Sequence, residues 1–144
     1  MILSINSSTA NALTREEEKR YQTIVLNEVN AYRLKQGLNT LILNDNISQE
    51  ARQHSLNMAA KKEKFGHHNF EQRIKHIKKH LSRFGGGAEN IACFKLSPQK
   101  VVQMWLTSPG HKRNIKSRAT LTGIGIAQDA KGWIYYTQIF VNDR

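Results

Sequence analysis

The first half of the chain carries its apolar residues at the three- and four-residue spacing of amphipathic helices. The longest such stretch covers residues 15–36, with Thr14 before it as a capping residue and glutamates in its first turn, where the helix dipole favours negative charge. Its apolar face comprises Tyr21, Ile24, Val25, Val29 and Tyr32. Gly37 follows as a helix-ending residue, so the pattern predicts a helix over residues 15–36.

Shorter segments with the same periodicity follow. Helices are expected over residues 47–62, 70–81 and 98–107. Ser97 is the expected cap of the last helix, with Pro98 at the first position, which proline tolerates. We expect Ser108-Pro109-Gly110 to end this helix, which would place His111 in a loop.

The last third of the chain changes to the two-residue period of strands. Residues 121–128 alternate in character, Asp129-Ala130-Lys131-Gly132 is a turn, and residues 133–141 are aromatic and β-branched on both faces. This pattern predicts a hairpin whose second strand is buried on both sides. A short extended segment is expected over residues 89–93, after the flexible connection Gly85-Gly86-Gly87.

Together the elements predict an α+β fold, with helices first and then a small sheet on which helices pack. The polar start of the chain predicts a flexible tether over residues 1–14, followed by one domain over residues 15–144. A length of 144 residues fits one ordinary domain with a core of its own.

Composition then excludes several classes of protein. Cys93 is the single cysteine, so a disulfide-built scaffold and a cysteine-rich zinc finger are both excluded. No apolar run approaches the ~20 residues that a transmembrane helix needs, so no transmembrane segment is expected. The first residues also lack the apolar stretch of a secretory signal.

Net charge is high and unevenly distributed. The formal charge is +11, and residues 72–128 contain eleven Lys and Arg against a single carboxylate, Glu89. One interpretation is an anion-binding surface over residues 72–118, with acidic glycans, anionic lipid headgroups or host proteins as partners. The other, which we favour, is a solvated lysine-rich face. Nucleic acid is not an expected partner, because no recognition helix or aromatic-basic platform is present.

Histidines at helix breaks are the first candidates for chemistry. His67 and His68 lie at one break and His111 beyond another, while Glu89 begins an extended segment. Imidazole nitrogens and carboxylate oxygens bind zinc, and the same groups can exchange protons. Their spacing matches no local metal motif such as HExxH, so the residues alone leave open a metal site, a proton-transfer site or a structural polar cluster. His54, on the core face of its helix, is expected to be a buried, hydrogen-bonded histidine.

Five ordered segments resemble the CAP superfamily of cysteine-rich secretory, antigen 5 and pathogenesis-related 1 proteins, also called SCP domains. The resemblance is to single-domain bacterial members and covers about residues 24–140. The segments are Phe65-Gly66-His67, Ala88-Glu89-Asn90-Ile91-Ala92, residues 105–115 with Ser108-Pro109-Gly110-His111, Gly123-Ile124-Gly125 and Tyr136-Thr137-Gln138-Ile139-Phe140.

The resemblance implies a three-layer α-β-α sandwich with a small, largely antiparallel sheet. It also implies a cleft that contains His67, Glu89 and His111, with His68 as the alternative to His67, and these residues would hold a divalent metal such as Zn²⁺. Ser108 stands near the position where animal and plant members carry a second glutamate. The family's paired cysteines are absent, so the fold must depend on its core alone.

The implied function is that of an extracellular or surface-attached binding module that is not an enzyme. One alternative is a hydrolase, either metal-assisted or with Ser108, His111 and Glu89 as a triad, although the G-x-S-x-G motif of many such enzymes is missing. Another alternative is a lipid or sterol carrier. The resemblance further implies export, as a secreted protein or a surface lipoprotein whose signal is absent from this chain.

Overall fold

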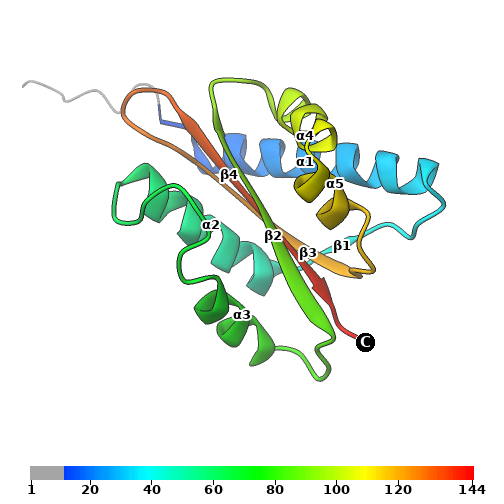
Figure 1. Cartoon of the computed structure of the whole chain (residues 1–144). Coiled ribbons are helices and arrows are strands. Elements are labelled where there is room, and N and C mark those ends of the chain that lie inside the picture. Colours follow the sequence, from blue (N-terminus) through cyan, green and yellow to red (C-terminus); the bar gives the residue numbers. More distant parts are fainter. Residues whose placement is uncertain (1–11) are drawn as a thin grey trace, which may run out of the picture.

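The computed structural model describes residues 12–144, which form five helices and four strands (Figure 1). In chain order they are α1 (Arg15–Lys35), β1 (Ile42–Leu43), α2 (Asp45–Ala59), α3 (Phe70–Lys78), β2 (Gly86–Phe94), α4 (Pro98–Thr107), α5 (Pro109–Ile115), β3 (Leu121–Gln128) and β4 (Ile134–Asn142). The tether predicted over residues 1–14 lies almost entirely outside the described residues. Thr14 caps α1 as expected, in a capping box with Glu17.

The strands form one mixed sheet in the order β1-β3-β4-β2. β1 runs parallel to β3, and β4 runs antiparallel to β3 on one side and to β2 on the other. Residues 134–141 of β4 are all buried, which confirms the prediction of a strand enclosed on both faces. β2 lies at the end of the sheet, and along its outer side the described residues place no further strand.

Helices cover both faces of this sheet (Figure 1). On one face α1 and α4 pack against β4 through a shared core that includes Val29, Trp105 and Tyr136. On the other face Ile47 of α2 and Ile77 of α3 pack against residues of β4. The fold is therefore α+β, as the pattern of elements predicted, and it is the three-layer α-β-α sandwich that the family resemblance implied.

Two glycines of β3 allow α2 to lie directly on the sheet. A Cβ atom added to Gly123 would stand 2.2 Å from the carbonyl carbon of Ile47, and one added to Gly125 would stand 2.1 Å from the backbone nitrogen of Arg52. Any larger residue at either position would push the helix away. The close approach of α2 brings His54, near the C-terminal half of that helix, against the sheet.

Several predicted boundaries were wrong. α2 covers Asp45–Ala59 instead of residues 47–62, and α3 ends at Lys78 instead of residue 81. Ser108-Pro109-Gly110 ends α4, but α5 begins at Pro109 instead of a loop, with proline again at the first helical position. His111 therefore lies on a helix. β2 is also longer than the predicted 89–93, because Gly86 and Gly87 pair with Asn142 and Val141 of β4.

Candidate functional site

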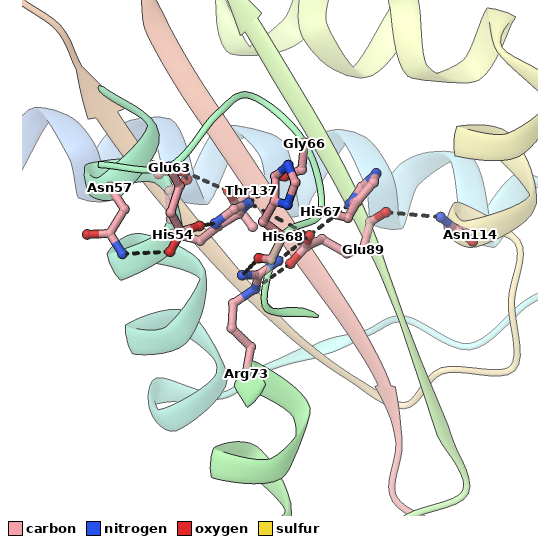
Figure 2. A network of polar contacts seen from close by, with 12 residues as sticks. His54, Asn57, Glu63, Gly66, His67, His68, Arg73, Glu89, Asn114 and Thr137 are labelled. Atoms are coloured by element: carbon pink, nitrogen blue, oxygen red, sulfur yellow. Dashed lines mark hydrogen bonds and ion pairs between the residues drawn. The ribbon is translucent and has the colours of Figure 1, made fainter. Parts of the chain in front are cut away.

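A buried ion pair between α3 and β2 is the centre of the candidate site (Figure 2). The guanidinium of Arg73 donates to both carboxylate oxygens of Glu89, from Nε to Oε2 at 2.8 Å and from Nη2 to Oε1 at 2.7 Å. Arg73 is 5% exposed and Glu89 6%. Such a two-pronged contact fixes the carboxylate in position and leaves it little freedom to bind anything else. Sequence analysis counted Arg73 among the surface basic residues and missed this pair.

His67 extends the pair toward solvent. Its Nδ1 lies 2.8 Å from Oε1 of Glu89, while the side chain remains 53% exposed. Because a carboxylate accepts, Nδ1 carries a proton, and in the neutral form of the ring Nε2, on the far side, has a free lone pair. Arg73 also donates to the backbone oxygen of His68 at 2.6 Å, which ties this loop to α3. His67 rather than His68 is thus the histidine that contacts Glu89.

A second histidine lies deeper, behind the same carboxylate. His54 is 1% exposed and contacts Glu63 through Nδ1 at 2.8 Å and the backbone oxygen of Gly66 through Nε2 at 2.7 Å. It is the hydrogen-bonded core histidine that the sequence predicted. Burial raises the pKa of Glu63, but the hydrogen bonds from Asn57 and His54 and the charge of His54 outweigh burial, so this pKa is lowered overall. The result is an ionised carboxylate held against a buried ring.

His111 reaches the site from the opposite side, on α5. A chain of amides positions it: Asn114 donates to the side-chain oxygen of Asn90 at 2.8 Å, and Asn90 donates to the backbone oxygen of His111 at 3.1 Å. Asn114 also donates to the backbone oxygen of Glu89 at 3.3 Å. Burial lowers the pKa of the His111 ring from its ordinary 6.5, and the charge of nearby His67 lowers it further, so the ring is neutral at pH 7.

The two histidines line one cavity of about 560 Å³. Its wall is mostly apolar and consists of Phe65, Gly66, Ile91, Ala92, Cys93, Phe94, Met104, Trp105 and Thr107, with Ser108 at the same rim. Glu89 does not line this cavity, because its carboxylate lies behind His67. The structure therefore brings His67 and His111 into one cleft and places Glu89 as the partner that holds His67.

Ser108 does not complete a hydrolytic triad. Although it lines the cavity with His111, the described part of the chain contains no hydrogen bond from its hydroxyl to His111 or to Glu89. Within residues 12–144, likewise, no three side chains of His, Cys, Asp or Glu come together in a group that could hold a metal ion. The cleft thus offers two imidazoles as ligands rather than the His-Glu-His trio.

Five of the basic residues lie in two different settings. Arg73 belongs to the buried ion pair, whereas Lys112, Arg113, Lys116 and Arg118 line a separate groove of about 760 Å³ beside α5. No helix among residues 12–144 has the length and apolar character needed to cross a membrane.

Sequence reasoning missed the residues that support the histidines. Asn90, which donates to the backbone of His111, and Arg73, which holds the carboxylate of Glu89, were not assigned. The sequence does contain an indication for Arg73, because this arginine lies on the apolar side of its helix, beside Phe70, Ile74 and Ile77. The signal for Asn90 was its place inside an otherwise apolar strand.

Known proteins have related sequences. Residues 26–140 match the CAP family, the cysteine-rich secretory protein family. The uncharacterized protein YkwD of Bacillus subtilis is 32% identical over 124 residues, which are 84% of this chain and 47% of that protein. The chain therefore spans about half the length of this curated relative.

Solved structures share the fold. An outer surface protein of Borrelia burgdorferi superposes with a TM-score of 0.76 at 21% identity, over 88% of this chain and 95% of that one. An extracellular SCP-domain protein of Bacillus anthracis gives a TM-score of 0.76 at 24% identity, over 90% of this chain and 44% of that one.

Proposed function

We propose that this chain, which belongs to the CAP family of cysteine-rich secretory proteins, is a non-catalytic binding module whose ligand enters the cleft between His67 and His111. The observation that carries the proposal is that both imidazoles line one apolar cavity. A pocket with apolar walls and a few convergent polar groups has the general character of a ligand site.

The groups around the cleft favour binding over catalysis. A hydrolase needs an activated nucleophile, and Ser108 has no base in hydrogen-bond contact among the described residues. Glu89 is held by Arg73 and His67, so it is not free to take a proton from a water molecule. What remains is a pair of imidazoles that can accept a proton donor or bind a cation.

A divalent cation such as Zn²⁺ fits two of these groups. His67, with Nδ1 held by Glu89, has the carboxylate-oriented ring that is common among zinc-binding histidines, and His111 is kept neutral by burial. Two protein ligands leave the other positions of a tetrahedral ion to water or to a ligand. We therefore expect weak binding of the metal alone, with Glu89 as the orienting residue.

A zinc titration tests the cleft. The melting temperature of the purified protein should rise in saturating ZnCl₂, and His111→Ala should abolish the rise because one of the two ligands is lost. His80→Ala is the matched control, since His80 is an exposed histidine on the α3 side and should leave the rise intact. No rise at saturating zinc, or a rise that survives His111→Ala, would remove the metal from the proposal.

We also propose that the protein acts outside the cytoplasm, in a secreted or lipid-anchored form. The support is that similar folds belong to an outer surface protein and to an extracellular protein. Labelling of intact cells with a membrane-impermeant amine reagent tests this, because a cytoplasmic protein would remain unlabelled. The single-domain organisation over residues 15–144 is part of the same proposal.

A further inference from the structure

The cavity between His67 and His111 lies along the open edge of the sheet. It is lined by four consecutive residues of β2, from Ile91 to Phe94. Side chains of a strand alternate between the two faces, so a cavity on one face would touch only every second residue. Contact with four in succession means that the cavity runs along the outer side of the strand and that backbone forms part of its wall.

The direction of the backbone groups follows from the pairing. In an antiparallel ladder, alternate residues exchange hydrogen bonds with the neighbouring strand and the others point away from it. The outward set in β2 contains Glu89, Ile91 and Cys93, because Asn114 donates to the backbone oxygen of Glu89 and the Trp105 indole donates to that of Ile91 at 3.1 Å. The N–H groups of the same residues therefore also point into the edge.

The two edges of the sheet differ in how their backbone groups are satisfied. On β3, beyond the end of β1, the N–H of Ile124 donates to the hydroxyl of Ser48 at 3.2 Å and its carbonyl accepts from Gln22 at 2.8 Å, so both groups are satisfied. On β2 the carbonyls of Glu89 and Ile91 are satisfied by side chains. Within residues 12–144, however, the N–H groups of Ile91 and Cys93 have no acceptor. The carbonyl of Cys93 points the same way and has no donor among the described residues, so this edge presents two donors and an acceptor.

We propose that the cleft binds an extended peptide segment, which adds to the outer edge of β2 as a further strand. The N–H groups of Ile91 and Cys93 lie about 7 Å apart, two residues along a strand, which is the spacing of the carbonyls of residues i and i+2 in an extended peptide. This inference names the ligand for the proposed binding function and rests on it.

The surroundings define the chemistry of that peptide further. The apolar wall, with Phe65 and Met104 at the rim 54% and 40% exposed, accepts one apolar side chain. None of the residues that line this cavity is Lys or Arg, and Glu89 behind it is paired with Arg73, so the site favours an uncharged segment of peptide. The backbone of the peptide passes between His67 and His111.

Substitution of Cys93 by proline and by alanine distinguishes the contribution of its backbone N–H to peptide binding from that of its side chain. Cys93→Pro removes an outward N–H without removing a bond to β4, so the fold should persist, whereas Cys93→Ala keeps the N–H. A library of random twelve-residue peptides is first screened for binding to the wild-type protein. The peptide that binds most tightly is then synthesised and titrated against the wild type and the two variants. We expect its Kd to rise about tenfold for Cys93→Pro and less than twofold for Cys93→Ala.

Amide NMR gives a second readout that does not depend on a variant. On addition of the peptide, the amide protons of Ile91 and Cys93 should shift downfield and exchange more slowly with water, while that of Ala92, which faces β4, should change little. Equal Kd values for Cys93→Pro and Cys93→Ala, or no added protection at Ile91 and Cys93, would overturn the proposal. So would protection of these amides by dodecanoate but by no selected peptide, which would indicate a lipid ligand instead.

The zinc titration shows whether a negative result concerns the added strand alone or the proposed binding function as well. If zinc binding requires His111 but the peptide experiments give the negative result, only the proposal of an added strand is wrong. If neither zinc nor any selected peptide binds, the cleft itself is not a binding site.

Discussion

His54 and His67 make nearly the same contact in two different settings. Each ring lies 2.8 Å from a glutamate oxygen, and both belong to the layer between α2, α3 and β2 (Figure 2). His54 is fully enclosed, and both of its nitrogens are used within the fold. His67 uses one nitrogen inward and offers the other to a cavity.

The difference shows how the chain separates scaffold from binding surface. The enclosed side, with Arg73, Glu89, His54 and Glu63, has its charges paired inside the protein. The open side has two imidazoles, an apolar wall and backbone donors that have no partner within residues 12–144. Rigid pairing on one side holds the groups on the other in place, so we expect changes on the enclosed side to affect stability and changes on the open side to affect binding.

The largest effect should come from breaking the buried ion pair. Arg73→Met leaves Glu89 as a buried carboxylate with only histidine partners, and removal of one member of such a pair costs about 3 kcal/mol or more. Urea unfolding of wild type and variant measures the loss. The double variant Arg73→Met/Glu89→Leu should recover more than half of it, because the unpaired charge is gone.

Two results would contradict the view that the enclosed side is held together by its paired charges. One is an Arg73→Met protein within about 1 kcal/mol of wild type, the cost expected of an ordinary hydrogen bond. The other is a double variant no more stable than the single one, which would mean that packing around Arg73 matters rather than its charge.

A smaller, pH-dependent effect is expected at Glu63. Glu63→Gln should lower the free energy of unfolding by about 1 kcal/mol at pH 7, since an ionised acceptor for His54 and Asn57 is replaced by a neutral one. The folded-state pKa of Glu63 lies below its ordinary 4.5, so its stabilisation is present above pH 4.5 and is lost as the pH falls through the lowered value. The gap between wild type and variant should close over that acidic range. A gap that is constant down to the acid transition would contradict the assignment.

The sequence predicted the fold well because its periods are long and consistent. Helix α1 and strand β4 each carry one unbroken pattern, and Thr14 and Ser97 mark helix starts by local hydrogen bonds that any context would keep. His67 and His111 were found through motif resemblance. α5 was missed because it is only seven residues long, too short for a period to show.

The supporting residues could not be predicted, because they act across the fold. Arg73 meets Glu89 over sixteen positions and Asn90 meets the backbone of His111 over twenty-one. No local pattern encodes such a meeting. The open edge of β2 is likewise a property of strand order, because β2 is the last strand of the sheet that residues 12–144 form and its inner side pairs with β4.

The smallest expected effect is on the titration of His111, and it tests whether the open side behaves as one site. Burial is the main reason that the pKa of His111 is lowered from 6.5, and the charge of His67 adds to it. In His67→Ala the second cause disappears and the cavity admits more water, so both changes raise the pKa of His111 toward 6.5 without reaching it. NMR titration of the ring proton measures this, with His80→Ala as the control that leaves the midpoint unchanged. An unchanged or lower midpoint in His67→Ala would mean that the two rings do not share one cavity, and the distinction between an enclosed scaffold and an open two-histidine cleft would fail with it.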